Sequence, residues 1–101
     1  MGYVRALSVR DLTPGTMTRV DVNGKKILVA NLKGTYYAMG DICMHRGCSL
    51  SNGTISGENI ECPCHGSTYS IVTGNIVRGP TTKPEPTFKV KIQGDLIMVS
   101  V

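Results

Sequence analysis

Apolar residues in the first part of the chain alternate with polar ones, which is the pattern of half-buried β-strands. Val20 and Val22 alternate with polar neighbours, and the pair Asn23-Gly24 favours a two-residue hairpin turn. The strand pattern resumes over residues 25–32 and, after a further turn, over residues 35–39. The sequence therefore predicts successive strands joined by tight turns.

The same alternation returns near the end of the chain. Phe88, Val90 and Ile92 alternate with polar residues, and a turn at Gly94-Asp95 leads into another strand over residues 96–101. No window holds the apolar stripe of a helix, and only residues 8–12 suggest one short helical turn. We therefore expect an all-β fold made of small antiparallel sheets.

The middle of the chain differs from both ends. It is rich in Gly, Ser, Thr and Asn, its alternation is weak, and it contains all four cysteines and both histidines. We interpret the chain as a single domain, 1–101. In this interpretation a β scaffold (1–39 and 81–101) carries an inserted, site-bearing segment (40–80).

Size and charge narrow the classes of function. A chain of 101 residues is one small domain, and domains of this size often need a metal, cluster or disulfide for stability. The formal net charge is +4, but the basic residues are scattered and the longest basic run is Lys25-Lys26, which argues against nucleic-acid binding. No apolar run approaches ~20 residues. We expect a soluble, cytoplasmic monomer without a membrane anchor.

Two short segments bring together residues that bind metals. The first segment contains Cys43 and His45, and after sixteen intervening residues the second contains Cys62, Cys64 and His65. Thiolate and imidazole suit zinc, copper or iron–sulfur centres. Structural zinc sites usually pair two cysteines, or two histidines, within one loop. Here each segment offers both a cysteine and a histidine, which favours a binuclear centre, although a zinc-stabilised module stays open at this point.

The two segments resemble the paired cluster-binding boxes of Rieske proteins. The first reads Cys43-Met-His-Arg-Gly-Cys48, and the second reads Cys62-Pro-Cys-His-Gly-Ser67. The resemblance implies a Rieske-type fold: a sandwich or incomplete barrel with an inserted cluster-binding subdomain. It also implies one [2Fe-2S] cluster, with Cys43 and Cys62 on one iron and His45 and His65 on the other.

The resemblance is to the respiratory and photosynthetic Rieske branch in particular. It implies a disulfide between Cys48 and Cys64. It also implies that Ser67 donates a hydrogen bond to a bridging sulfide and Tyr69 to a ligand sulfur. Arg46 departs from that branch, which usually has an apolar residue there, and the expected lack of an anchor is a second departure. The combination resembles the small soluble, high-potential Rieske proteins of archaea, of the sulredoxin type.

These features imply an electron-transfer protein that is not an enzyme. Two ferric ions, two sulfides and two thiolates sum to a neutral centre, which accepts an electron more readily than a four-thiolate dianion. We therefore expect a soluble one-electron carrier with a high-potential cluster. The imidazole ligands should make that potential pH-dependent, and unidentified redox proteins should be its partners. The alternative is a ferredoxin component or small subunit of a Rieske-type oxygenase or reductase system.

Overall fold

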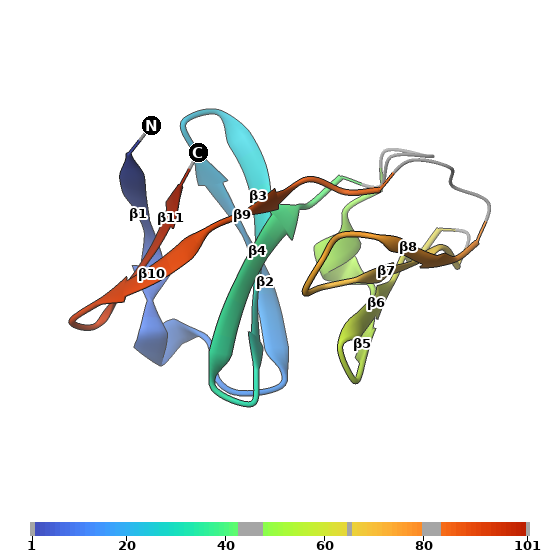
Figure 1. The fold of residues 1–101 in the computed structure, drawn as a ribbon, viewed down its shortest axis with the longest axis horizontal. Coiled ribbons are helices and arrows are strands. Elements are labelled where there is room, and N and C mark those ends of the chain that lie inside the picture. The colour runs from blue at the N-terminus through green and yellow to red at the C-terminus, as the bar shows by residue number, and fades with distance from the viewer. Residues whose placement is uncertain (1, 43–47, 65, 80–83, 101) are drawn as a thin grey trace.

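The computed structural model describes residues 2–42, 48–64, 66–79 and 84–100, which fold into three antiparallel sheets (Figure 1). The all-β prediction is confirmed, because only two 3-10 turns of three residues accompany the strands in the described ranges. No helix in these ranges is long and apolar enough to cross a membrane.

The first sheet joins the two ends of the chain. Its strand order is β1-β11-β10. These strands are β1 (Tyr3–Ser8), β10 (Val90–Gln93) and β11 (Leu96–Ser100). After β1, the turn η1 (Val9–Asp11) forms where residues 8–12 suggested a helical turn, and the Ser8 hydroxyl accepts a hydrogen bond from the Arg10 amide. Both termini therefore lie at this end of the molecule.

The second sheet contains the predicted hairpins. Its order is β2-β3-β4-β9. These strands are β2 (Thr16–Val22), β3 (Lys25–Leu32), β4 (Thr35–Gly40) and β9 (Thr87–Phe88). Asn23 and Gly24 have φ angles of 51° and 79°, as a two-residue hairpin turn requires. Its predicted place between β2 and β3 is confirmed by their register, which pairs Val22 with Lys25.

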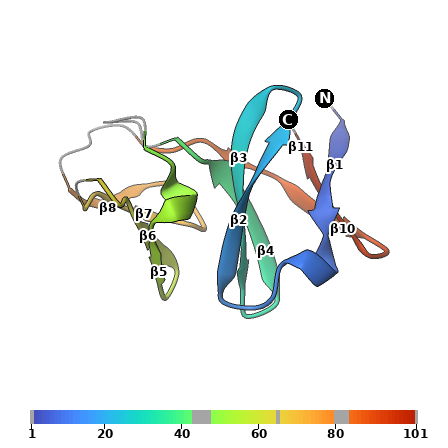
Figure 2. The ribbon, with the colours of Figure 1, turned by 180° about the vertical axis from the view of Figure 1, so that it is seen from behind.

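The third sheet lies inside the segment that we predicted to carry the site. It is the β-meander β5-β6-β7-β8, preceded by the 3-10 turn η2 (Leu50–Asn52). Its strands are β5 (Thr54–Ser56), β6 (Asn59–Glu61), β7 (Thr68–Ser70) and β8 (Ile76–Arg78). Figures 1 and 2 show this sheet at the end of the molecule opposite the termini.

Strand β3 joins the three sheets into one body because both of its faces are buried. Leu28 and Ala30 pack into the core under the β5–β8 sheet, whereas Ile27 and Val29 pack into the core against the β1-β11-β10 sheet. All four side chains are completely buried. A strand covered on both faces loses the polar alternation of a half-buried strand. The central scaffold therefore supports the site-bearing sheet directly.

Candidate metal centre

The second box forms the turn between β6 and β7. Cys62 follows β6 directly and is 2 % exposed, packed in the core below the β5–β8 sheet. Its amide donates to the Ser67 carbonyl at 2.7 Å, and its carbonyl accepts from the Gly66 amide at 3.2 Å. Gly66 has a φ of 76°, a backbone conformation that glycine adopts without steric cost. The turn is thus closed by its own backbone, with the thiol on the core side.

The base of the first box is closed in a similar way. The chain leaves β4, and Ile42 forms an isolated antiparallel bridge with Ser49. The Leu50 amide donates to the Asp41 carbonyl at 2.6 Å. The two ends of the first box are therefore held side by side at the edge of the scaffold. Residues 43–47, between those ends, lie outside the described ranges.

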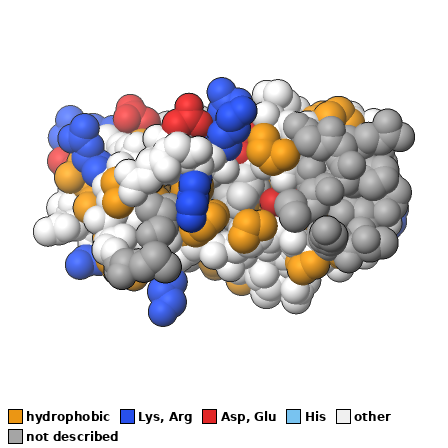
Figure 3. Space-filling model, turned by 90° about the horizontal axis from the view of Figure 1, so that it is seen from above, with side chains coloured by type: hydrophobic (Ala, Val, Ile, Leu, Met, Phe, Trp, Pro, Cys, Tyr) orange, Lys and Arg blue, Asp and Glu red, His pale blue; other side chains and the backbone are white. Residues whose placement is uncertain are grey.

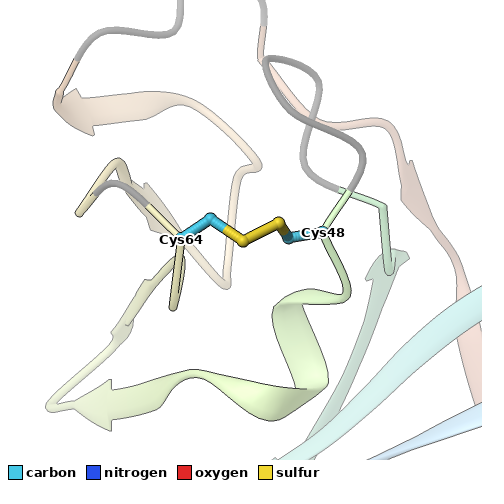
Figure 4. Close-up of a disulfide and its surroundings, with 2 residues drawn as sticks. All are labelled: Cys48 and Cys64. Atoms are coloured by element: carbon cyan, nitrogen blue, oxygen red, sulfur yellow. A yellow bond between two sulfur atoms is a disulfide. The ribbon is translucent and has the colours of Figure 1, made fainter.

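A disulfide between Cys48 and Cys64 joins the two boxes (Figure 4). The Cα atoms are 6.4 Å apart and the two cysteines are separated by 16 positions in the sequence. The bond agrees with the pairing implied by the resemblance. In the chain-entropy model, closing a loop of this size stabilises the fold by about 3 kcal/mol. The disulfide therefore holds the second box at a fixed distance from the end of the first.

Ser67 and Tyr69 lie directly behind the second box. Both side chains are fully buried, and Tyr69 packs in the same core as Cys62. Each of the two residues makes at least one polar or ring interaction. Hydroxyls buried at this depth are costly unless they are hydrogen-bonded. Their role as donors to cluster sulfurs stays a prediction.

The segment after β8 lies tightly against the second box. Gly79 has a φ of 121°, and a Cβ atom built there would be 2.4 Å from the Ser67 Cα atom. Only glycine allows this close approach. The sequence Arg78-Gly79-Pro80 resembles the proline loop that covers Rieske clusters, but Pro80 lies outside the described ranges.

Three of the four predicted iron ligands, Cys43, His45 and His65, lie outside the described ranges, as does Arg46. Their ligand roles stay predictions. Cys62 is the predicted ligand that the structure places. Within the described ranges, no three His, Cys, Asp or Glu side chains group together as a metal site. The buried thiol, the disulfide between the boxes and the buried hydroxyls nevertheless fit a protein-ligated iron–sulfur cluster.

Two buried carboxylates at the base of the first box were not predicted. Asp41 is completely buried and Glu85 is 4 % exposed. Charged side chains are rarely buried at this level. The sequence signal for Asp41 was its place two residues before Cys43. Nothing comparable marked Glu85, which lies in the irregular connection before β9.

Comparison with known proteins agrees with this geometry. The Rieske [2Fe-2S] domain family matches residues 2–91. The ferredoxin component of biphenyl 2,3-dioxygenase from Rhodococcus jostii (strain RHA1) is 34 % identical over 101 residues, which covers 100 % of this chain and 94 % of that protein. The cytochrome b6-f complex iron-sulfur subunit of Chlorobaculum thiosulfatiphilum is 35 % identical over 101 residues, covering 92 % of this chain and 55 % of that protein.

A solved structure extends the similarity to the whole fold. The ferredoxin of carbazole 1,9a-dioxygenase from Nocardioides aromaticivorans IC177 superposes with a TM-score of 0.93 at 29 % identity. The match covers 99 % of this chain and 98 % of that one. The scaffold sheets and the β5–β8 sheet therefore keep the same arrangement in both proteins.

Proposed function

Because the chain belongs to the Rieske [2Fe-2S] domain family and its cofactor is one Rieske-type [2Fe-2S] cluster, we propose that it is a soluble one-electron carrier. It is an electron-transfer protein and not an enzyme. The observation that carries this proposal is the buried Cys62 thiol in a self-closed turn, joined to the end of the first box by the Cys48–Cys64 disulfide.

The cluster is held by Cys43 and Cys62 on one iron and by His45 and His65 on the other. Support comes from the paired boxes in the sequence and from the core-facing position of Cys62. When bound, the cluster supplies reversible one-electron chemistry. All four ligands come from the protein, so its side chains hold the metal and exclude substrate from it. The Ser67 and Tyr69 hydroxyls donate toward the sulfurs from the buried side.

The partners are redox proteins, and an oxygenase component is the kind that the relatives favour. The Rhodococcus relative and the Nocardioides structure are both ferredoxins of dioxygenases, which matches the alternative drawn from the sequence. The disulfide and Ser67 favour the respiratory and photosynthetic branch instead, and the Chlorobaculum relative belongs to such a complex by name. The cytoplasmic location, the monomeric state and the archaeal, sulredoxin-type assignment stay predictions.

The ligand set is tested by iron and labile-sulfide content in single variants. We expect Cys43→Ser, His45→Ala, Cys62→Ser and His65→Ala to lose the cluster. Cys48→Ser is the matched control, because it also replaces a cysteine by serine but breaks only the disulfide. We expect this variant to assemble the cluster under gentle anaerobic expression. The visible and EPR spectra of the parent protein give the decisive comparison with zinc, since a zinc protein is colourless. Full loading of a Cys43→Ser protein would refute the assignment.

Histidine ligation also predicts how the potential depends on pH. Each bound imidazole keeps a proton on its outer nitrogen, and oxidised iron makes that proton more acidic than reduced iron does. The midpoint potential should be constant at first and then fall by about 59 mV per pH unit once one proton accompanies the electron. Voltammetry from neutral to alkaline pH measures this slope. A constant potential throughout would show that histidine does not ligate the iron.

A further inference from the structure

Asp41 connects three parts of the fold at the base of the first box. Its amide donates to the Lys26 carbonyl of β3 at 3.1 Å, and its carbonyl accepts from the Leu50 amide at 2.6 Å. Its Oδ1 atom accepts from the Ser51 amide at 2.8 Å, which ties the carboxylate to the 3-10 turn η2. Together with the Ile42–Ser49 bridge, these bonds fix both ends of the segment that carries Cys43.

The second carboxylate oxygen of Asp41 has no such role. Oδ2 is buried and has no hydrogen-bond partner. The side chain of Lys26, the neighbouring cation, is exposed. In the described part of the chain the ion pairs are Arg10–Asp95 and Arg78–Glu61, and neither involves Asp41. Unpartnered buried oxygens are rare in native proteins and need a specific explanation.

An asparagine would hold the η2 turn equally well. Its side-chain carbonyl accepts the Ser51 amide in the same geometry, and a neutral amide costs far less to bury than a carboxylate. Hydrogen bonding alone therefore accounts for an oxygen at this position but not for a charge. A second buried carboxylate lies close by, since Glu85 Oε1 is 2.8 Å from where a Cβ atom would stand on Gly40. The first box is therefore preceded by a region with two buried acidic side chains.

A fixed negative charge near the cluster affects its two redox states unequally. The reduced cluster carries one more negative charge than the oxidised cluster, so repulsion from a nearby carboxylate disfavours reduction. The effect is larger in a protein interior than in water because the effective dielectric constant is lower, about 20 instead of about 80. Exposed carboxylates are screened by solvent and salt and should contribute little.

We propose that Asp41 sets the cluster's reduction potential: it anchors the segment carrying Cys43 and holds an uncompensated negative charge there, which lowers the potential. Asp41 is a positioning residue, because it is not one of the proposed iron ligands and its hydrogen bonds to Lys26, Leu50 and Ser51 hold the start of the segment that carries Cys43. The inference rests on the proposed ligand set, since it requires the cluster to be bound by Cys43. It opposes the effect of the Ser67 and Tyr69 hydroxyls, which raise the potential.

The test compares neutral and charged variants of the cluster-loaded protein. Asp41→Asn keeps the acceptor for the Ser51 amide and removes the charge. We expect its reduction equilibrium to shift about tenfold toward the reduced cluster, which is about 59 mV for one electron. Its thermal unfolding should stay close to that of the parent. Asp41→Ala should show the same rise in potential together with earlier unfolding and faster exchange of the Ser51 amide.

The matched control is Asp21→Asn, which removes an exposed carboxylate from β2 and should leave the potential unchanged. A loaded Asp41→Asn protein with the parental potential would overturn the proposal. Iron content and the EPR spectrum of the parent test the proposed function separately, so the two failures are distinguishable.

A measurement on the parent protein decides the matter if the Asp41 variants do not hold the cluster. The chain has four aspartates, of which Asp41 is buried and the other three are exposed. Isotope labelling of aspartate carboxylates makes their infrared bands visible in a difference spectrum between oxidised and reduced protein. We expect one carboxylate band to shift on reduction, and to persist in a protein whose three exposed aspartates are replaced by asparagine. No shifted aspartate band would refute the proposal.

Discussion

At the scale of single residues, we expect the side-chain hydroxyls of Ser67 and Tyr69 to influence the reduction potential of the cluster. Both are completely buried behind the Cys62 turn. A donor aimed at sulfur stabilises the reduced state more than the oxidised state, because the reduced cluster is more negative. We therefore expect the two hydroxyl groups to raise the reduction potential of the cluster.

Ser67→Ala and Tyr69→Phe should each lower the midpoint potential. A hydrogen bond worth ~1 kcal/mol more to the reduced state corresponds to about 40 mV for one electron. Voltammetry at fixed pH measures the shift. Ser56→Ala and Tyr37→Phe are matched controls: Ser56 is exposed on β5, and Tyr37 packs against the same core as Tyr69. If the midpoint potentials of Ser67→Ala and Tyr69→Phe shift no more than those of the two controls, the hydroxyls do not act on the cluster.

Single residues also show how far the sequence predicts the site. Cys62 and Ser67 were identified because the Rieske boxes fix them by spacing, and the structure places both in one closed turn. Asp41 and Glu85 were missed, because burial of a carboxylate depends on which segments cover it. Those segments include the connection before β9, whose course no local pattern indicates. Interpretation from sequence therefore finds ligands more readily than the charges around them.

At the level of strands, the sequence predicted the tight turns between consecutive strands, but it did not predict which distant strands pair with each other. The hairpins around Asn23-Gly24 and Lys33-Gly34 form as predicted, with Lys33 at a φ of 55°. The strand predicted over residues 88–92 instead divides at Lys89 between two sheets, so that β9 pairs with β4 and β10 with β11. Alternation indicates an extended chain but does not identify its neighbour. The β5–β8 strands were missed because three residues are too few to show a period.

The contact between Gly79 and the second box determines how the end of β8 packs. Gly79→Ala meets two costs: a backbone conformation that side chains rarely adopt, of about 1–3 kcal/mol, and overpacking against Ser67, of about 1–3 kcal/mol. We expect the free energy of unfolding, measured with denaturant, to fall by the sum of these two costs. We also expect the reduction potential of the cluster to change, because Ser67 is displaced. The measurement is a denaturation midpoint combined with voltammetry.

Gly57→Ala is the control for this prediction. Gly57 has a φ of 61°, but no atom lies within 4 Å of its Cβ position. The Gly57→Ala protein should lose about 1–2 kcal/mol of folding stability, because alanine adopts the left-handed backbone conformation less readily than glycine. Its reduction potential should stay that of the parent. Equal losses of stability in the two variants would mean that the contact with Ser67 contributes nothing.

Across the whole molecule, charge is distributed so that the surface is more basic than the composition suggests. The formal net charge is +4, and two of the acidic side chains, Asp41 and Glu85, are buried. Every Lys and Arg in the described ranges is exposed. Figure 3 shows Lys and Arg side chains spread over the scaffold half of the molecule. The oxidised cluster is formally neutral, so one electron lowers the net charge by one unit and both redox states stay cationic.

This distribution predicts how the carrier selects its reaction partners. A cationic protein attracts anionic reagents over distances up to the Debye length, about 30 Å at 0.01 M salt and about 3 Å at 1 M. The reduced protein should therefore be oxidised by hexacyanoferrate(III) at a rate that falls roughly tenfold as salt rises over this range. A cationic oxidant such as a cobalt(III) ammine should show the opposite trend. Stopped-flow absorbance of the cluster measures both rates, and the pair of reagents controls for any general effect of salt on the protein. If the cationic oxidant is also slowed by salt, the region around the cluster carries a negative field of its own, and partners would be selected by that local charge instead of by the net charge of the molecule.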